Sequence, residues 1–335
     1  MKISVIGAGA IGALVGGYLA GQGGDVTLIA RPAEAAVINR DGLIIDGVRG
    51  RKVIRLPAAA RLEAGSDLVI LAMKTQDIAE AIAANRAALA GALIIGVQNG
   101  LRADEIIAQA LPGAKHLASI VMFGATYLEP GRVTHNFEGD WLVGGGIMGN
   151  VSLEGIVEVL GKALTVRTVA DIRGMKWLKL FLNLNNCLPA LLGRSMQETF
   201  ADREMCRLAI SLWREALVLV DKAGIELADL PDFPVGRLRG LAGMPLDEAA
   251  GIYSGIMTGL SREPLYGSVL QSIKRGRPSE IDYINGEVAR LGAGRGGAPL
   301  NEKAVNMVHR VEREGCFLSA AEVREGFGVP SGVAK

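Results

Sequence analysis

The sequence predicts an α/β protein in which a doubly wound parallel sheet is followed by an all-helical domain. The stretch from Lys2 to Ala20 has the pattern of a strand, a glycine-rich turn and a helix. Apolar, strand-like runs then alternate with helical stretches, and after Asp171-Ile172-Arg173-Gly174 the pattern stays helical to the end. A length of 335 residues fits two domains, because single cores seldom grow beyond about 250 residues. We therefore expect an N-terminal domain over 1–170 and a helical domain over 171–335.

The glycine-rich turn has a spacing typical of dinucleotide-binding sites. It consists of Gly7-Ala8-Gly9-Ala10-Ile11-Gly12. In such a unit the first glycine permits the tight turn, the second lets a pyrophosphate approach the backbone, and the third allows close packing of helix and strand. The helix N-terminus then faces the phosphates with free N–H groups and the positive end of its dipole. A purely structural glycine turn is the alternative, but the position between a strand and a helix favours a Rossmann domain.

The end of the second strand indicates which dinucleotide is bound. The buried run Asp25–Ala30 ends at Arg31, about 20 residues after the glycines, where an NAD site would place a carboxylate. A guanidinium can pair with a 2′-phosphate through two hydrogen bonds and gains nothing comparable from a neutral hydroxyl. The alternative is a solvated arginine at a strand end. We predict NADP(H) as the cofactor.

Two further strands end in polar residues. The apolar runs Asp67–Ala72 and Ala92–Val97 are followed by Lys74 and Asn99. Ligands of doubly wound sheets lie beyond the carboxyl ends of the strands. We therefore expect Arg31, Lys74 and Asn99 on the cofactor edge, although Lys74 could be a solvated loop charge and Asn99 part of a plain turn.

The remaining segments of the first half complete this domain. Helices are expected from about Asp77 to Leu89 and from near Arg102. The runs Leu43–Asp46 and Lys52–Leu56 flank a glycine-containing turn and predict a hairpin insertion. Alternating segments from His116 to Gly145 predict antiparallel strands that extend the sheet and close the domain.

Composition excludes several classes of partner. The 36 basic and 35 acidic residues give a net charge of +1, and only 4% of residues are aromatic, so we expect neither nucleic acid nor a charged membrane surface as partner. No run reaches the roughly 18 to 20 apolar residues of a membrane-spanning helix. Cys187, Cys206 and Cys316 have neither metal-ligand nor disulfide-framework spacing. We therefore predict no metal site and a cytoplasmic location.

The helical half is expected to begin with one apolar helix, Met175–Leu192, that carries polar groups on one side. Lys179, Asn183 and Asn186 fall at i, i+4 and i+7 and share one stripe. Buried polar groups without partners cost about 1 to 3 kcal/mol each, so a functional role is favoured over a solvent-facing side with a snorkelling lysine. Lys176, nearer the helix start, is expected to be a solvated charge.

A second candidate lies near Glu280. Ser279 could cap a helix that begins near Glu280, and a carboxylate in the first turn suits the helix dipole. These facts explain Glu280 without any catalytic role. Other helices are expected at Arg203–Ala223, Leu265–Lys274 and Asn301–Glu312, with a Pro/Gly-broken connector at Ile225–Pro245.

Taken together, short motifs along residues 1–315 resemble the ketopantoate reductases. Each is unspecific alone, but they occur in the order found in that family. They are GAGAIG at Gly7, Arg31 after the second strand, Met73-Lys74, Gln98-Asn99-Gly100, Trp177-x-Lys179-Leu180-x-x-Asn183 and Glu280-Ile281-Asp282-Tyr283-Ile284-Asn285-Gly286.

The resemblance implies a fold and an activity. The fold is an N-terminal Rossmann domain and a helical C-terminal domain like that of 6-phosphogluconate dehydrogenase, with the active site in the cleft. The activity is reduction of 2-dehydropantoate (ketopantoate) to pantoate with NADPH, a step toward pantothenate and coenzyme A. A homodimer or a monomer is expected.

The resemblance also implies roles for single residues at the reacting centre. Lys179 matches the catalytic lysine, the general acid that protonates the ketone oxygen. Asn99 matches an asparagine between the nicotinamide ribose and that lysine, and Lys74 matches a lysine beside the cofactor. An ammonium group at this place both stabilises the developing oxyanion and supplies the proton.

The substrate-binding residues are implied in the same way. Asn183 matches a substrate-binding asparagine, Glu280 the glutamate that engages the substrate hydroxyl, and Ser268 the serine that holds the carboxylate. Burial would lower the pKa of Lys179, and Glu280 would counter that shift if it lies close.

Departures from the family pattern concern the substrate end. Cys187 stands where the family commonly has a second substrate asparagine before a proline, and the proline is displaced to Pro189. Asn186 is the alternative second asparagine, because its helical phase is nearly as good. Ser272 stands where relatives often carry aspartate. Reduction of another small 2-oxo acid is therefore an open alternative.

A third hypothesis belongs to another class, a non-catalytic NADP-binding sensor. Such a protein would be expected to lack the proton donor. Lys179 and Glu280 are both present, which disfavours it.

Overall fold

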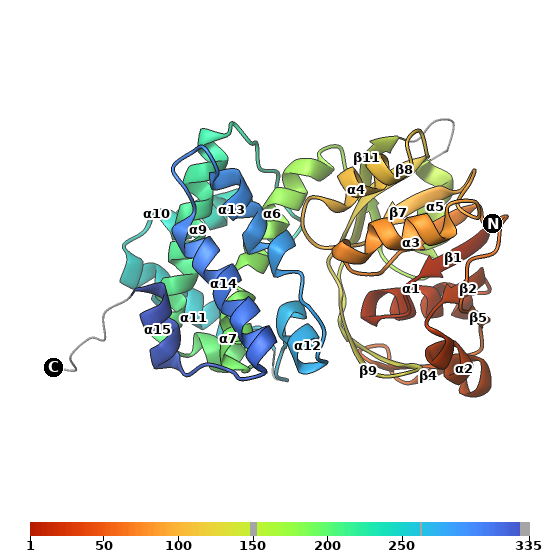
Figure 1. Cartoon of the computed structure of the whole chain (residues 1–335), viewed down its shortest axis with the longest axis horizontal. Helices are drawn as coiled ribbons and strands as arrows, with labels where there is room; N and C mark the ends of the chain where they lie inside the picture. Colours follow the sequence, from red (N-terminus) through yellow and green to blue (C-terminus); the bar gives the residue numbers. More distant parts are fainter. Residues whose placement is uncertain (148–152, 262, 329–335) are drawn as a thin grey trace. The chain divides into compact units, whose positions relative to one another are not determined.

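The computed structural model describes residues 1–147, 153–261 and 263–328, which form two compact units. The first unit, Met1–Ile172, combines two sheets with helices, and the second, Arg173–Lys335, is helical (Figure 1). The predicted order of an α/β domain followed by a helical domain is confirmed.

The main sheet of the first unit has the order β12-β11-β8-β7-β6-β1-β2-β5. Six neighbouring strands, from β8 to β5, run parallel, whereas β11 pairs antiparallel with β8. The sheet grows outward from β1 in both directions, which confirms the doubly wound topology. The strands are β1 (Lys2–Ile6), β2 (Asp25–Ile29), β5 (Ala58–Ala59), β6 (Leu68–Leu71), β7 (Leu93–Gly96), β8 (His116–Val121), β11 (Trp141–Ile147) and β12 (Val166–Thr168).

Helices cover both faces of this sheet. Val5 of β1 packs into one core with residues of α1 and α5, and Leu71 of β6 packs into another with residues of α3 and α4 (Figure 1). Strands buried on both faces are apolar throughout, as the continuous runs in the sequence predict. The helices are α1 (Ala10–Gly21), α2 (Pro32–Asp41), the short η1 (Thr75–Asp77), α3 (Ile78–Asn85), α4 (Ala103–Ala110) and α5 (Leu153–Gly161).

A second sheet, of order β4-β3-β10-β9, completes the first unit. The predicted hairpin insertion is present as the antiparallel pair β3 and β4. The prediction that 116–145 extends the main sheet is correct for β8 and β11 but wrong for β9 and β10, because β10 pairs with β3. These strands are β3 (Leu43–Gly47), β4 (Lys52–Ile54), β9 (Gly124–Glu129) and β10 (Arg132–Phe137).

The helix α1 lies between the two sheets. A β-carbon at Gly16 would lie 2.6 Å from the Leu28 side chain of the main sheet, and one at Gly17 would lie 2.7 Å from Ile45 of the second sheet. Such close approach on both sides favours glycine, and a helix that is apolar all round must be covered on every side. The second sheet covers the side of α1 that the main sheet leaves open.

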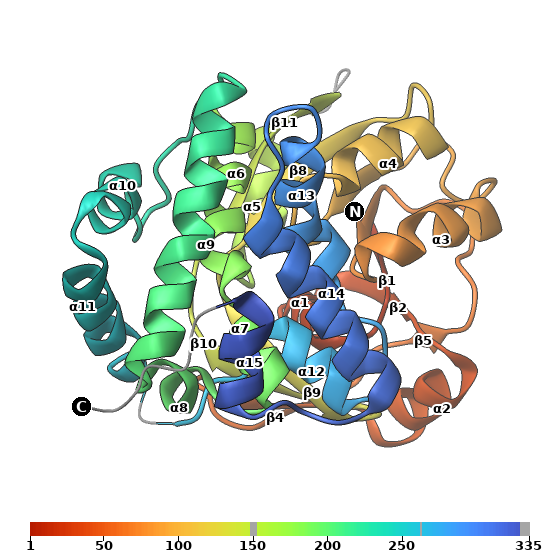
Figure 2. The same ribbon diagram turned by 60° about the vertical axis from the view of Figure 1, so that its left-hand side comes forward.

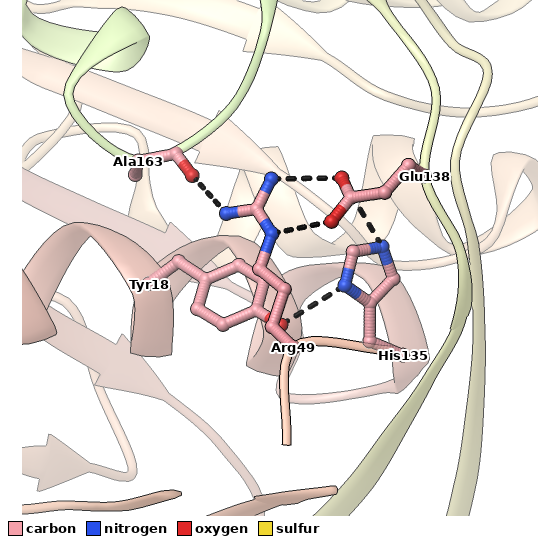
Figure 3. A network of polar contacts seen from close by, with 5 residues as sticks. All are labelled: Tyr18, Arg49, His135, Glu138 and Ala163. Carbon is pink, nitrogen blue, oxygen red and sulfur yellow. Dashed lines mark hydrogen bonds and ion pairs between the residues drawn. The ribbon is translucent and has the colours of Figure 1, made fainter. Parts of the chain in front are cut away.

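A polar network fixes the second sheet against α1 (Figure 3). The Tyr18 hydroxyl lies 2.9 Å from His135 Nδ1, and the Arg49 guanidinium lies 4.7 Å from the centre of the Tyr18 ring. Arg49 also donates to both Glu138 carboxylate oxygens, at 2.6 and 2.8 Å, and to the Ala163 carbonyl at 2.6 Å. Burial lowers the pKa of His135, so this ring stays neutral at neutral pH. The network thereby holds the helix that begins at the glycine turn.

The second unit is built around the long helix α9. It contacts α10, α11, α13 and α14, and Figure 2 shows α9 beside α14. In the described part of the chain, no helix is long and apolar enough to cross a membrane. The helices are α6 (Ile172–Leu184), α7 (Cys187–Leu192), α8 (Met196–Phe200), α9 (Arg203–Lys222), α10 (Val235–Gly243), α11 (Leu246–Thr258), α12 (Ser268–Lys274), η2 (Ile281–Tyr283), α13 (Asn285–Gly292), α14 (Pro299–Glu314) and α15 (Ala320–Phe327).

Candidate active site

The glycine turn after β1 has a distinct geometry at each glycine. Gly7 has a φ of +103°, and a β-carbon there would lie 2.7 Å from the Met73 nitrogen. A β-carbon at Gly12 would lie 1.9 Å from the Gly7 carbonyl oxygen, so the third glycine permits the close packing. At Gly9 a β-carbon would meet nothing within 4 Å. Gly9 is therefore the position at which a ligand can approach the backbone.

The N-terminus of α1 fits a pyrophosphate. Gly9 caps the helix without a side-chain hydrogen bond, and the first turn contains no acidic residue. Ala8 is buried, whereas Gly9, Ala10 and Ile11 remain partly exposed. The first backbone N–H groups of the helix are thus left for a ligand, and the helix dipole favours an anionic one.

Three predicted cofactor residues lie at the same edge of the main sheet. The register pairs Ile6 at the end of β1 with Ile29 of β2 and with Leu71 of β6. Arg31 follows the end of β2, Lys74 follows β6, and Asn99 follows β7. The structure therefore brings all three to the edge that carries the glycine turn, and their roles there remain predictions.

Arg31 has an acidic partner that the sequence did not suggest. Its Nη2 forms an ion pair with the Glu34 carboxylate in the first turn of α2. The Arg31 side chain is 62% exposed and that of Glu34 only 10%. The Glu34 charge also acts on Tyr127: burial and this charge together raise the pKa of Tyr127 to about 12. The i, i+3 spacing on α2 is the only sequence signal for the ion pair.

Gln98 is a second residue at this edge that sequence reasoning did not single out. Its Nε2 donates to the Leu71 carbonyl at 2.8 Å and to the Met73 carbonyl at 2.9 Å. Gln98 is buried. It therefore joins the ends of β6 and β7 and fixes the backbone next to Lys74 and Asn99.

In the second unit, the predicted helix Met175–Leu192 is broken in two. The first part, α6, ends at Leu184, and the second part, α7, begins at Cys187. Pro189 has no N–H for the Asn185 carbonyl, and its ring would clash with that carbonyl in a continuous helix. At the third position of α7 the missing N–H costs nothing. The prediction of one helix was wrong because it ignored Pro189.

Tertiary hydrogen bonds stabilise the break. Trp213 Nε1 donates to the Phe181 carbonyl at 2.7 Å, and Asn285 Nδ2 donates to the Leu184 carbonyl at 3.1 Å. These bonds satisfy carbonyls at the end of α6 that have no helical partner. Asn285 lies in the Glu280–Gly286 motif, so one part of that motif has a structural role.

The break brings the two predicted asparagines together. Asn186 Nδ2 donates to Asn183 Oδ1 at 3.2 Å. A β-carbon at Gly267 would lie 3.2 Å from Asn186 Oδ1, so the residue before Ser268 borders the same polar group. Asn183 Nδ2 is buried and has no hydrogen-bond partner among the residues that the structure describes. An amide in that state is suited to bind a substrate oxygen.

Cys187 is not part of this polar group. It is buried, and burial raises the pKa of its thiol to about 12. Its Sγ accepts a weak hydrogen bond from Asn285 at 3.9 Å. Between the two candidates for the second asparagine position, Asn186 is the one that contacts Asn183.

Lys179 has a strongly lowered pKa. Burial is the main cause and the positive charge of Lys176 adds to it, whereas the Glu280 charge opposes the shift, and the pKa falls to about 7. The prediction of a solvated Lys176 was wrong, since this residue is only 6% exposed. A lysine with a pKa near 7 can give and regain a proton at neutral pH.

Glu280 precedes a short 3-10 turn rather than opening an α-helix. The turn is η2, and α13 begins only at Asn285. Ser279 Oγ accepts from the Ile281 N–H at 3.3 Å, so the predicted cap exists on a different element. The proposed first-turn dipole effect on Glu280 is therefore wrong, and the effect of its charge on the pKa of Lys179 is what concerns the site.

Known proteins resemble this chain over both units. The models of the Ketopantoate reductase PanE/ApbA family match residues 3–146, for the N-terminal part, and 171–312, for the C-terminal part. The chain belongs to the ketopantoate reductase family. It is therefore an oxidoreductase, and this family together with the glycine turn supports a nicotinamide dinucleotide as cofactor.

Individual ketopantoate reductases cover most of the chain. The 2-dehydropantoate 2-reductase of Pyrococcus horikoshii is 30% identical over 291 residues, which is 86% of this chain and 89% of that protein. A PanE/ApbA family ketopantoate reductase from Ralstonia eutropha has a TM-score of 0.79 at 25% identity and covers 94% of this chain and 99% of its own. D-mandelate dehydrogenase has the same fold, with a TM-score of 0.80 at 22% identity over 94% of this chain and 99% of its own.

Proposed function

We propose that this protein reduces 2-dehydropantoate to pantoate with NADPH, with Lys179 as general acid, as a step toward pantothenate and coenzyme A. The observation that carries the proposal is the paired amide group of Asn183 and Asn186 at the end of α6, the helix that contains Lys179. The pKa of Lys179, lowered to about 7 by burial and by Lys176 against the opposing charge of Glu280, supports its role as general acid. Membership of the ketopantoate reductase family supports the reaction class.

The chemistry requires one hydride and one proton. NADPH, held by the residues of the first unit, would supply the hydride to the ketone carbon. Lys179 Nζ donates a proton to the ketone oxygen, where negative charge develops, and its ammonium form stabilises that charge before the transfer. A lysine with a pKa near 7 is a far better proton donor than a solvated one at the same pH.

Residues of the second unit would bind the substrate. Asn183 and Asn186 form a paired amide group, and we assign both to substrate oxygens, with Asn186 in place of the family's second asparagine. Ser268, next to Gly267, is assigned to the carboxylate and Glu280 to the hydroxyl of the substrate. The unsatisfied Nδ2 of Asn183 supports this assignment.

Residues of the first unit would bind the cofactor. The turn Gly7–Gly12 receives the pyrophosphate, Lys74 and Asn99 contact the ribose side of the nicotinamide, and Arg31 contacts the 2′-phosphate. The opening at Gly9 and the uncapped N-terminus of α1 support the first assignment.

Replacement of Arg31 tests the preference for NADPH. We expect Arg31→Gln to raise the KM for NADPH by about 10- to 100-fold, because a charged hydrogen-bonding pair with the phosphate is lost. The KM for NADH should stay nearly unchanged. The exposed Arg40, which pairs with Asp41 at the other end of α2, provides the control Arg40→Gln. An equal loss with NADH and NADPH would remove Arg31 from this role.

The decisive assay compares substrates. Oxidation of NADPH by the purified protein is measured with ketopantoate and with 2-oxo acids that lack its hydroxyl. Strong preference for ketopantoate is the expected result, since Glu280 would then have a hydroxyl to recognise. No turnover with any 2-oxo acid would overturn the proposal and restore the non-catalytic sensor.

A reductase of another small 2-oxo acid is the second candidate. The buried Cys187 at the family's asparagine position favours it, because the substrate end is where the chain departs from the family pattern. Turnover only with acids other than ketopantoate would establish this candidate and keep the roles of Lys179 and the cofactor residues.

Replacement of Lys176 and of Glu280 should shift the pH profile of kcat/KM in opposite directions. A general acid must be protonated, so kcat/KM is expected to fall as the pH rises above the pKa of Lys179, about 7. Lys176→Gln removes a like charge and should move this fall to higher pH. Glu280→Gln removes an opposite charge and should move it to lower pH. The measurement is kcat/KM from pH 5 to about pH 9, and shifts in the same direction would contradict the assignment.

A further inference from the structure

The segment that carries Glu280 is tied to helix α14 on both sides of that residue. The Ser279 N–H donates to Glu312 Oε1 at 2.7 Å. The other oxygen of that carboxylate lies 2.9 Å from His309 Nδ1, and His309 Nε2 lies 3.0 Å from Asp282 Oδ1. We call Ser279, Asp282, His309 and Glu312 the His309 clasp. It holds the residue before Glu280 and the second residue after it.

The clasp requires a protonated histidine. A neutral imidazole donates from one nitrogen only, and its other nitrogen would turn a lone pair toward a carboxylate. With carboxylates at both nitrogens, only the imidazolium form satisfies both contacts. Burial lowers the pKa of His309, but the hydrogen bonds that the ring donates to Asp282 and Glu312 outweigh it, and the pKa is raised.

The charged groups around this ring come from two elements. Asp282 faces it from η2, and Glu312 faces it from α14 itself. Within the described residues, α7, α9, α13 and α15, which also pack against α14, contribute no ion pair to His309. The same contacts lower the pKa of Glu312, where burial opposes the bonds from Ser279 and His309.

We propose that His309 and Glu312 are positioning residues that hold Glu280 beside Lys179, and that the clasp opens when His309 loses its proton. The inference rests on the proposed function for its effect on rate, but the clasp and its effect on Lys179 can be measured without turnover. Loss of the proton removes one of the two His309 contacts and loosens the attachment of 279–282 to α14, so the Glu280 charge opposes the lowering of the Lys179 pKa less strongly.

The pH dependence has a definite sign. A histidine whose folded-state pKa is raised contributes its stabilisation fully below its unfolded pKa of about 6.5. That contribution is lost as the pH rises through the folded-state value. The clasp is therefore closed below a pH of about 6.5 and opens as the pH rises through the raised pKa of His309.

Three variants separate positioning from general stability. His309→Ala removes both contacts, whereas His309→Arg keeps donors for both carboxylates on a group that does not titrate in this range. Arg310→Gln, which removes an exposed ion pair with Glu314 from the next position of α14, is the matched control. We expect His309→Ala to raise the KM for the 2-oxo acid on the order of 10- to 100-fold and to move the alkaline fall of kcat/KM to lower pH, as Glu280→Gln does. His309→Arg and Arg310→Gln should do neither, and the KM for NADPH should not change in any of them.

Two measurements test the clasp independently of activity. The chain has 3 histidines, so NMR titration of their ring protons, assigned with His309→Ala, gives the pKa of His309, which is expected above the ordinary value. Labelling of Lys179 by acetic anhydride, followed by peptide mapping, reports its deprotonated fraction, which should rise in His309→Ala and not in Arg310→Gln.

Each outcome has one meaning. Lack of turnover in the wild-type protein, with the NMR and labelling results as expected, would refute the proposed function and support the clasp. A His309 pKa at or below the ordinary value, or unchanged Lys179 labelling in His309→Ala, would overturn the clasp. Unchanged KM and pH profile in an active His309→Ala variant would overturn the positioning role.

Discussion

Replacement of Lys179 by alanine is expected to lower kcat by about 10²- to 10⁴-fold, the usual contribution of a general acid. The ketone oxygen would lose both its proton donor and the ammonium charge that stabilises it. The affinity for NADPH should stay nearly unchanged, because the residues assigned to the cofactor belong to the first unit. Steady-state kcat and a fluorescence titration of NADPH binding provide the two measurements.

Two further variants sharpen this test. Lys179→Arg keeps a positive charge but holds its proton too tightly to donate it, since the arginine pKa lies above 12. It should therefore be nearly as slow as the alanine variant. Lys222→Ala, at an exposed lysine of α9 whose Nζ donates to the Arg295 carbonyl at 3.3 Å, should keep full activity. A normal kcat in Lys179→Ala would exclude Lys179 as the proton donor.

The first unit was predictable where a local pattern determines the structure. The turn Gly7–Gly12 lies directly between β1 and α1, as the spacing of its glycines predicts. Gly7 and Gly12 have steric reasons in the protein itself, whereas the space at Gly9 is open. Arg31, Lys74 and Asn99 meet at one edge because parallel strands share the direction of their carboxyl ends. In both cases a rule of geometry connects the sequence to the position.

The structure differs from the prediction where partners lie far apart along the chain. β10 pairs with β3 rather than with the main sheet, because α1 needs a cover on its outer side. The break before Cys187 depends on Pro189, which the sequence shows, but also on Asn285 and Trp213, which lie in other helices. Lys176 is buried although its polarity suggested exposure.

In the candidate site, too, features set by a local pattern could be predicted, whereas contacts between distant parts of the chain could not. The stripe that contains Lys179 and Asn183 could be predicted from helical spacing, since both lie on α6. Asn186 contacts Asn183 although the helix ends between them, because the turn at 185–186 directs Asn186 toward Asn183. His309 and Glu312 could not be predicted as partners of the residues that flank Glu280, since no local pattern connects α14 with 279–283.

Alanine at Gly9 and at Gly12 should separate cofactor binding from folding. At Gly12 the new β-carbon would lie 1.9 Å from the Gly7 carbonyl oxygen and 2.8 Å from Ala72 Cβ. Because backbone atoms must move, we expect Gly12→Ala to lower the free energy of unfolding by about 1 to 3 kcal/mol or more. Thermal unfolding of the protein without cofactor measures this loss.

Gly9→Ala should instead weaken NADPH binding and leave the stability of the free protein nearly unchanged. Its backbone, at φ −77° and ψ −165°, is accessible to alanine, and a β-carbon there would meet no atom within 4 Å. Alanine is a weaker N-cap residue than glycine, so the substitution should lower the free energy of unfolding by about 1 kcal/mol or less. The β-carbon would, however, occupy the space through which a pyrophosphate reaches the N–H groups of α1, so the Kd for NADPH should rise about tenfold or more, equivalent to at least about 1.4 kcal/mol.

The pair is informative because each variant is the control for the other. Loss of NADPH binding in Gly9→Ala at an almost unchanged melting temperature would locate the pyrophosphate at this helix end, since no change in the packing of the free protein could explain it. Normal NADPH binding in a folded Gly9→Ala protein would show that the phosphates lie elsewhere. The glycine turn would then serve only to let α1 pack closely after β1, which is the role that Gly7 and Gly12 already have.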